Sequence, residues 1–385
     1  MNQAAFFAPF IRGSLIEKTG QRHLVRFLTT APTSQELAAL TITLATAEDE
    51  ATVAQTISKA IEENSAVPQL VHLVLGQDKY TYAIGQSPSA IEAIAEGKVP
   101  EAEAPVVASR ANVMKNKVVV VTGGAQGFGA EIVRGLVAGD ALVFVADLNL
   151  EGATKFTQEL NQEYNRTVAL PVAVNVADEK SVAEMIENIA LSAGGLDLCV
   201  SNAGVLRASS ILQQDIDSFR FVTDINYTAF AIITKHCALL MKKQQATAPS
   251  LLTDIIQINS KSGLEGSNKN GSYAGGKFGS IGLVQSFALE LVEYGIKVNA
   301  VCPGNFFDGP LWSDPEKGLF VQYLRTGKVP GAKTIADVKK FYEAKVPMNR
   351  GCYGEDVIRA VYYLVEQAYE TGQALPVTGG QVMLN

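Results

Sequence analysis

The stretch KVVVVTGGAQGFGAEIV, residues 117–133, decides how most of this chain is expected to fold. Its apolar run has the length of a buried strand, and a helical pattern begins near Gly127. The turn between them contains Gly123, Gly127 and Gly129. Such a turn lets the backbone N–H groups at the start of the helix face a phosphate group. The stretch therefore predicts a strand–turn–helix unit that binds a dinucleotide, with a tight turn lacking any ligand as the alternative.

The same alternation of strand and helix continues to the C-terminus. The apolar runs that follow the first are ALVFVAD, VALPVAVN, LDLCVSNAG, TDIIQINS, KVNAVCPG and ALPVTGG. They are apolar on both faces, as expected for strands buried between two layers of helices. Residues 114–385 are therefore predicted to form an α/β, doubly wound, Rossmann-type parallel sheet of seven strands.

Residues 1–113 have a different pattern, which predicts a small N-terminal α/β region. Residues 40–47 alternate like a strand, and residues 48–64 carry apolar side chains at helical spacing. QLVHLVLG and KYTYAIG predict a hairpin around Gln77-Asp78, and a short helix is expected over residues 88–97. A linker rich in Pro, Ala and Glu follows. The role of this region stays open between oligomerisation, shaping of the pocket, and a vestige.

The composition is that of a globular protein and excludes several classes of function. The chain has 385 residues, of which 47% are hydrophobic and 18% charged, and its net charge is -7. We expect no nucleic-acid surface, no membrane span and no secretory signal. Four dispersed cysteines and three dispersed histidines predict neither a disulfide framework nor a metal site. A cytoplasmic protein that acts on a small molecule is the default expectation.

Asp147 follows the second predicted strand, about 20 residues after the glycine turn. A carboxylate at this position accepts hydrogen bonds from the adenosine ribose of NAD and repels the additional phosphate of NADP. No lysine or arginine comes directly after it, and the turn carries Gln126 in place of a cation. The sequence therefore favours NAD, with an exposed strand-end aspartate as the alternative.

Four motifs in order resemble the short-chain dehydrogenase/reductase family over residues 115–385: TGGAQGFG, the strand-end Asp147, SNAG, and YAGGK at residues 273–277. The resemblance implies homodimers or homotetramers formed through long helices that begin near Asp217 and Ser272. Two positions depart from the family, with Asn175 where many members have aspartate, and Asp308, left outside the site, where many have threonine. The cofactor-binding residues that the resemblance implies are Gly123, Gln126, Gly127, Phe128, Gly129, Asp147, Asn175, Val176, Asn202, Ala203, Gly204, Tyr273, Lys277, Pro303 and Gly304.

Tyr273 and Lys277 are four residues apart, which places them on one face of a helix. A tyrosine, with an ordinary pKa of about 10, carries protons near neutral pH when a cation stabilises its phenolate. The resemblance implies that Tyr273 is the acid/base, and that Lys277 lowers its pKa and holds the nicotinamide ribose. It also implies that Ser260 binds the substrate oxygen and that Asn226 supports a water chain. Ser262 is the neighbouring alternative to Ser260, and a buried structural amide is the alternative for Asn226.

The segment from Asn305 to about Arg350 is expected to cover the substrate. Its cations outnumber its acids between residues 320 and 350, which favours an anionic substrate over a mixed solvated surface. The stretches NSKSG, CPGNFFDGPLW, KVPMNRGCYGEDV and VTGGQVMLN resemble the bacterial sorbitol-6-phosphate 2-dehydrogenases of this family. That resemblance implies NAD-dependent oxidation of sorbitol 6-phosphate to fructose 6-phosphate, with Lys261 on the phosphate or a hydroxyl group. An unphosphorylated polyol, sugar or hydroxy acid stays open as substrate, as does a non-catalytic NAD-binding regulator.

Overall fold

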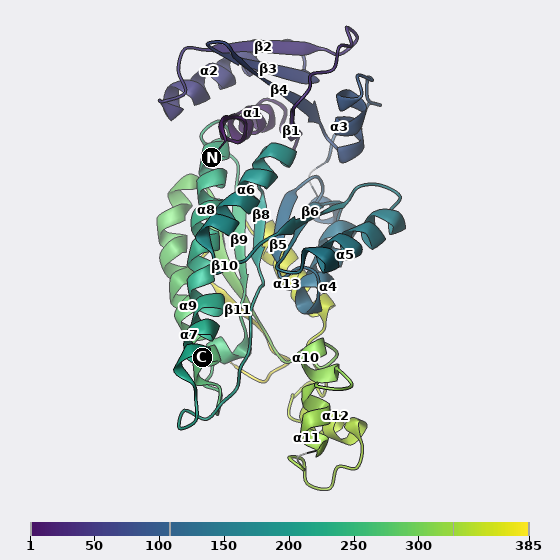
Figure 1. Ribbon diagram of the computed structural model, residues 1–385, viewed down its shortest axis with the longest axis vertical. Coiled ribbons are helices and arrows are strands. Elements are labelled where there is room, and N and C mark those ends of the chain that lie inside the picture. The colour runs from purple at the N-terminus through teal and green to yellow at the C-terminus, as the bar shows by residue number, and fades with distance from the viewer. Residues whose placement is uncertain (1, 108, 326, 384–385) are drawn as a thin grey trace.

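The computed structural model describes residues 2–107, 109–325 and 327–383. It is an α/β protein with one sheet of four strands and one of seven, arranged one beyond the other along the long axis (Figure 1). The ends of the two predicted regions, Met1 and Leu384–Asn385, lie outside the described residues. Among the described helices, none has the length and apolar content needed to cross a membrane.

The seven-stranded sheet is parallel throughout and has the order β11-β10-β9-β8-β5-β6-β7. All seven predicted strands are present, which confirms the predicted fold class. The chain crosses from β7 back to β8 on the other side of β5. The C-terminal ends of β5 and β8 therefore form a switch point, where sheets of this kind bind ligands. The strands are β5 (Val118–Thr122), β6 (Leu142–Asp147), β7 (Ala169–Ala173), β8 (Leu198–Ser201), β9 (Thr253–Ile258), β10 (Ile296–Pro303) and β11 (Ala374–Val377).

Helices cover both faces of this sheet. One layer contains α4 (Gly127–Ala138), α5 (Leu150–Glu163) and α13 (Gly354–Glu366). The other contains α6 (Glu179–Ala193), α7 (Ile216–Thr223), α8 (Ala229–Gln245) and α9 (Gly271–Leu291). Val118 and Val120 belong to the core under α6, α8 and α9, whereas Val119 and Val121 belong to the core under α4 and α13. Because each strand supplies both cores, its sequence is a continuous apolar run.

The four-stranded sheet has the order β1-β4-β3-β2, in which β2 and β3 are parallel and the other pairs antiparallel. The strand, hairpin and two helices expected between residues 40 and 97 are present. Two elements, α1 and β1, were not predicted. The elements of this part are α1 (Gln3–Thr19), β1 (Leu24–Leu28), β2 (Ala39–Leu44), α2 (Glu50–Glu63), β3 (Leu70–Leu75), β4 (Asp78–Gly85) and α3 (Pro88–Ala95).

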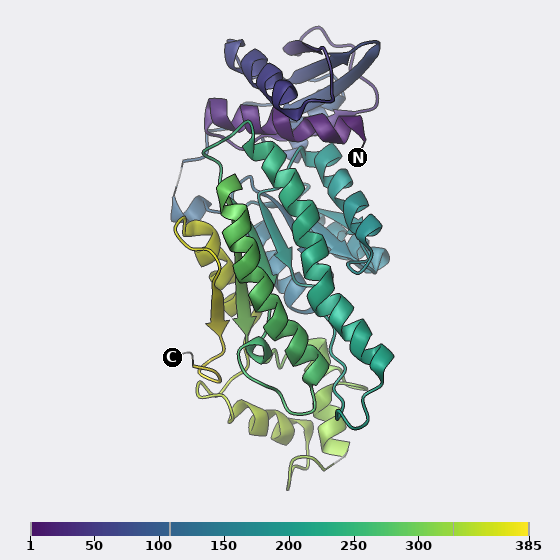
Figure 2. The same ribbon diagram turned by 90° about the vertical axis from the view of Figure 1, so that its left-hand side faces the viewer.

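Helix α1 lies between the two sheets, where it crosses the ends of α6 and α8 (Figure 2). It contacts α2 and β1 on one side and α6 and α8 on the other. Gly13 permits the close approach to α8, because a Cβ there would lie 2.2 Å from the backbone oxygen of Gln244. The helix is therefore buried around almost its whole circumference.

Arg12 of α1 makes a buried ion pair with Asp197, the residue directly before β8. The guanidinium donates to both carboxylate oxygens, at 3.2 and 2.7 Å, and also to Gln244 Oε1 and the His23 backbone oxygen. Burial by itself would raise the pKa of Asp197, but Arg12 and Arg22 together lower it well below its usual range. The carboxylate of Asp197 is thus held charged in the interior.

The segment after β10 forms a separate lobe at the opposite end of the molecule from α1 (Figure 1). Its helices are α10 (Pro310–Ser313), α11 (Leu319–Arg325) and α12 (Ile335–Glu343). They enclose a small core of their own, formed by Phe307, Trp312, Phe320, Val329, Val338 and Val346. Short irregular helices complete the fold: the 3-10 turns Arg110–Asn112, Lys261–Gly263 and Val292–Tyr294, and the π-helical turn Asp224–Thr228.

Candidate active site

The glycine turn between β5 and α4 forms a cradle that side chains would fill. Gly123 has a φ of 61°, and a Cβ on Gly129 would lie 2.0 Å from the backbone oxygen of Gly123. Gly127 has a φ of 57°, and a Cβ there would meet nothing within 4 Å among the described residues. Gln126 is exposed, and no hydrogen bond from its side chain caps α4. The first N–H groups of α4 are thus left for an external anion, and this fits the pyrophosphate of a dinucleotide.

Asp147 lies beside this turn at the end of β6. Its Oδ2 accepts a hydrogen bond from the backbone N–H of Ala125 at 3.2 Å, and its Oδ1 accepts one from Asn149 at 3.0 Å. The carboxylate is half-buried. Its position next to the turn fits the ribose contact expected for a dinucleotide in this fold.

Asn202 and Ala203, which follow β8, are hydrogen-bonded to the end of β5. Both backbone N–H groups donate to Thr122 Oγ1 at 3.1 Å, and Asn202 Nδ2 donates to the backbone oxygens of Thr122 and Gly123 at 3.0 Å. The buried Thr122 was not singled out in the sequence, although it begins the TGG motif. These contacts fix the two strand ends at the switch point.

Asn226 lies in the π-helical turn between α7 and α8, a type of distortion that is frequent at functional sites. It is 2% exposed, and its amide forms two hydrogen bonds with the backbone of Val205, at 3.0 and 2.7 Å. A Cβ on Gly204 would lie 2.9 Å from Asn226 Oδ1 and 3.8 Å from Lys277 Nζ. The structure thus brings Asn226 and Lys277 together around Gly204.

Lys277 and Tyr273 project from the first turns of α9. Lys277 is 4% exposed, donates to the backbone oxygen of Ile258 at 2.9 Å, and has its Nζ 5.8 Å from the centroid of the Tyr273 ring. Burial lowers the pKa of Lys277 to about 8. Burial raises the pKa of Tyr273, while its hydrogen bond with Ser260 acts in the opposite direction. The structure therefore differs from the expectation that Lys277 lowers the Tyr273 pKa, because desolvation of the phenol dominates and the ammonium is bonded to Ile258.

Ser260, rather than Ser262, is the serine that contacts Tyr273. Ser260 Oγ also accepts from the Ser262 N–H at 3.1 Å, and the Ser260 N–H donates to Asn259 Oδ1 at 2.8 Å. The buried Asn259 additionally donates to the backbone oxygen of Lys277 at 3.0 Å. Asn259 was not predicted as a site residue, and its position directly before Ser260 was the one available signal. It fixes the end of β9 against α9.

Phe128 on the glycine turn stacks on Phe306, which follows β10, with ring centroids 4.3 Å apart and an interplanar angle of 13°. Pro303 ends β10, and the N–H of Gly304 donates to the Val377 oxygen at 2.9 Å. Phe306 was not predicted, because an aromatic pair across 178 residues leaves no local pattern. The stack brings the segment after β10 beside the turn.

Three other predicted positions are less closely tied to this cluster. The exposed Asn175 uses its Oδ1 to accept from the Ala177 N–H at 3.2 Å, and the neighbouring Val176 is buried. Lys261 is half-buried in the 3-10 turn that follows Ser260. Asp308, which we left outside the site, is exposed and forms an ion pair with Lys339 at 2.6 Å.

Several cations of the lobe after β10 already have partners, either within the lobe or at the start of α13. Arg350 makes two hydrogen bonds to Asp356, at 2.6 and 2.9 Å. Lys328 lies over the Tyr323 ring at 3.9 Å and Lys345 over the Phe341 ring at 4.3 Å. The excess of positive charge in the sequence is therefore distributed over the lobe. Across the described residues, His, Cys, Asp and Glu form no group of three or more that could hold a metal ion.

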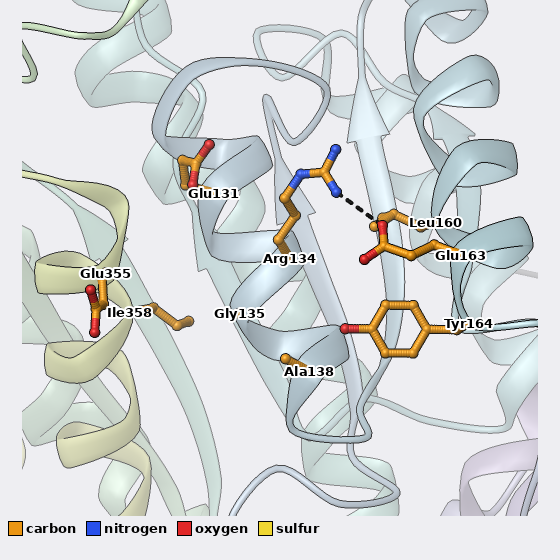
Figure 3. Close-up of a pocket in the computed structure, with 9 residues that line it drawn as sticks. All are labelled: Glu131, Arg134, Gly135, Ala138, Leu160, Glu163, Tyr164, Glu355 and Ile358. Atoms are coloured by element: carbon orange, nitrogen blue, oxygen red, sulfur yellow. Dashed lines mark hydrogen bonds and ion pairs between the residues drawn. The ribbon is translucent and has the colours of Figure 1, made fainter.

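A separate hollow of about 330 Å³ lies between α4, α5 and α13 (Figure 3). Arg134 reaches across it to Glu163, with 3.4 Å between the bonded atoms, and Glu131 and Glu355 lie on its other side (Figure 3). None of the predicted site residues lines it. It is thus distinct from the cluster at the strand ends.

Comparison with known proteins agrees with this geometry. Residues 117–312 match the family model for short chain dehydrogenases. Sorbitol-6-phosphate 2-dehydrogenase of Escherichia coli (strain K12) is 35% identical over 271 residues, 70% of this chain and 99% of that enzyme. Cis-4-hydroxycyclohexanecarboxylate dehydrogenase of Sinomonas cyclohexanicum is 33% identical over 267 residues, 69% of this chain and 96% of that enzyme.

The crystal structure of sorbitol-6-phosphate 2-dehydrogenase SrlD from Erwinia amylovora is similar, with a TM-score of 0.63 and 35% identity. The similarity covers 69% of this chain and 100% of that one. Members of the matched family act on CH–OH groups of small molecules and generally bind NAD or NADP. Strand order, glycine turn and sequence identity lead to one conclusion: the chain belongs to the short-chain dehydrogenase family of oxidoreductases.

Proposed function

We propose that the protein is an NAD-dependent dehydrogenase that oxidises sorbitol 6-phosphate to fructose 6-phosphate. The observation that carries the proposal is the cluster of Asn226, Ser260, Tyr273 and Lys277 at the ends of β8 and β9. The cluster lies at the C-terminal ends of the strands, as does the glycine turn that follows β5. The similarity to two sorbitol-6-phosphate 2-dehydrogenases, each at 35% identity, supports the choice of substrate.

In this proposal a bound NAD supplies the acceptor for the hydride that leaves the carbinol carbon. Tyr273 in its phenolate form takes the hydroxyl proton and becomes the neutral phenol, and Ser260 hydrogen-bonds the same substrate oxygen. Lys277, whose ammonium donates to the Ile258 oxygen and lies 5.8 Å from the Tyr273 ring centroid, is our candidate contact for the nicotinamide ribose. Asn226 keeps the backbone at Val205 in place beside Gly204, which leaves room around the Lys277 ammonium. Lys261, directly after Ser260, is our candidate contact for the substrate phosphate.

The cofactor preference rests on Asp147. Replacing it by alanine removes a hydrogen-bonding carboxylate beside the turn, and we expect NAD binding to weaken by about 10- to 100-fold. Discrimination against NADP should decrease at the same time, because a negative charge is lost. Kd values for both cofactors, from fluorescence titration, measure the effect. Glu159→Ala, an exposed acid on α5, is the control and should leave both values unchanged. Tighter binding of NADP than NAD by the native protein would contradict the assignment.

The substrate is tested by a screen of polyols, sugars and their phosphates with NAD and NADP. We expect NADH formation with sorbitol 6-phosphate, and fructose 6-phosphate as the product. Sorbitol at the same concentration should react at least about tenfold more slowly, because it lacks the charged group. Absence of NADH with sorbitol 6-phosphate together with turnover of sorbitol would overturn the phosphate specificity and leave the oxidoreductase assignment intact.

A hydroxy acid is a second candidate substrate. Several cations of the lobe after β10 already have partners, in the lobe or at the start of α13, so the lobe does not by itself select a phosphate. The relative from Sinomonas cyclohexanicum, named for a hydroxy-carboxylate, is 33% identical. Cis-4-hydroxycyclohexanecarboxylate therefore belongs in the screen.

We also propose a cytoplasmic homodimer or homotetramer that associates through α8 and α9. Leu239, Phe278 and Leu289 are large apolar side chains on these helices, and they are 47%, 46% and 82% exposed. Exposed apolar side chains on neighbouring helices are typical of an interface. The molar mass of the native protein in solution decides between monomer, dimer and tetramer.

A further inference from the structure

A hollow of about 280 Å³ lies at the end of the seven-stranded sheet where the strands begin, opposite the candidate active site. Three segments that are distant in the sequence line it. They are residues 20–22 between α1 and β1, described residues of the connection from 106 to 117, and residues 365–366 at the end of α13. The hollow is therefore a junction between the N-terminal part and the dehydrogenase part of the chain.

The polar lining of this hollow is mainly basic and amide. Arg22, Lys115 and Lys117 contribute cations, and Asn112 and Asn116 contribute amides. The one acid in the lining, Glu366, forms an ion pair with Arg110. The connection is held over the hollow by Gln21, whose side chain accepts from the Val106 N–H at 2.8 Å and donates to its oxygen at 3.3 Å.

Lys117 is buried in this lining without a hydrogen-bond partner. The residue as a whole is 6% exposed, but its ammonium nitrogen keeps some contact with solvent, and no hydrogen bond to it is formed within the described residues. Burial lowers the pKa of Lys117 to about 8, and Arg22 adds to the decrease. An ammonium group that lines a hollow without a hydrogen bond from the protein is free to bind an acceptor from outside.

The charges behind the hollow are also out of balance. Four buried or half-buried cations, Arg12, Arg22, Lys117 and Lys297, face two buried carboxylates, Asp197 and Asp254. Arg12 pairs with Asp197 at 2.7 Å, and Lys297 pairs with Asp254 at 2.9 Å. Arg22 Nε lies 3.3 Å from Asp197 but has no hydrogen-bond partner among the described residues. Arg22, which shares Asp197 with Arg12, and Lys117, which has no ion pair in the part of the chain that the structure describes, are the two of these cations that line the hollow.

We propose that this hollow binds a small dianion of the phosphate monoester class, which contacts Lys117, Arg22 and Lys115. A phosphate group carries about 1.5 to 2 negative charges at neutral pH and three acceptor oxygens, which matches the excess of two cations over carboxylates behind the hollow. The amides of Asn112 and Asn116 offer neutral donors for the remainder of the ligand. Because both parts of the chain line the hollow, the bound anion stabilises their association. The site is separate from the catalytic cluster and does not depend on the proposed substrate.

The test uses the full chain and inorganic phosphate as the probe. Titration by calorimetry should show saturable binding, and phosphate should raise the Tm more than sodium chloride of equal ionic strength does. Lys117→Met should weaken phosphate binding at least about tenfold, since it removes a charged hydrogen-bond donor. Lys115→Met, on the half-buried rim, is the second variant and keeps the test open if Lys117→Met does not fold. Lys59→Met on the exposed face of α2 is the control and should bind like the native protein.

Two results would overturn the proposal. One is phosphate binding that is unchanged in both Lys117→Met and Lys115→Met. The other is binding abolished by Lys261→Met but kept in Lys117→Met, because the phosphate would then occupy the active site. A rise in Tm no larger than that caused by sodium chloride would also overturn the proposal, since it indicates an effect of ionic strength alone.

Discussion

Replacing Tyr273 by phenylalanine should lower kcat by a factor of about 10² to 10⁴ and leave the Kd for NAD unchanged within about twofold. The phenol oxygen is the one atom removed, and in our proposal it carries the substrate proton. The ring is half-buried, and its remaining contacts are kept by phenylalanine. Steady-state rates with the best substrate of the screen and a fluorescence titration of NAD measure the two quantities.

Tyr363→Phe on α13 is the matched control for this prediction. Tyr363 is 43% exposed and lies outside the cluster, so that loss of its hydroxyl should leave kcat unchanged. Equal activity of Tyr273→Phe and the native protein would exclude Tyr273 as the proton carrier. NAD binding by the native protein without turnover of any substrate in the screen would instead favour the alternative of a regulator that binds NAD without catalysis.

The seven-stranded sheet was predictable because each of its strands is buried on both faces. A strand such as β5, with valines facing two different cores, leaves a continuous apolar run that local pattern reading detects. Helix α1 was missed for a related reason. It is buried on nearly all sides and contains Pro9 and Gly13, so the sequence shows neither an amphipathic stripe nor the usual helix composition. Its helical state depends on packing between the two sheets.

Some site residues could likewise be predicted from local sequence patterns, whereas others depend on contacts between distant parts of the chain. Tyr273 and Lys277 are one turn apart on α9, and Asp147 comes at the end of its strand, so their spacing was visible in the sequence and the family resemblance implied their roles. Thr122, Asn259 and Phe306 act through contacts between different strand ends, and no periodicity marks such residues. The direction of the Lys277 ammonium, toward the Ile258 oxygen, also depends on the fold and not on spacing.

Replacing Arg12 by methionine should lower the free energy of unfolding by about 3–5 kcal/mol. The side-chain volume is largely kept, but the carboxylate of Asp197 loses two hydrogen bonds and its main counter-charge inside the protein. Urea unfolding followed by circular dichroism measures the change, with separate fits if the two parts of the chain unfold in separate steps. Arg26→Met, at an exposed position of β1, is the control and should change stability by less than about 0.5 kcal/mol.

A double replacement separates the charge from the other bonds of Arg12. If the loss comes from an uncompensated carboxylate, then adding Asp197→Asn to Arg12→Met should recover about half of it, because the buried charge disappears. No recovery would mean that the hydrogen bonds from Arg12 to Gln244 and to the His23 oxygen account for the stability. Recovery would mean that one ion pair, between residues 185 positions apart, determines how firmly the N-terminal part is held against the dehydrogenase sheet.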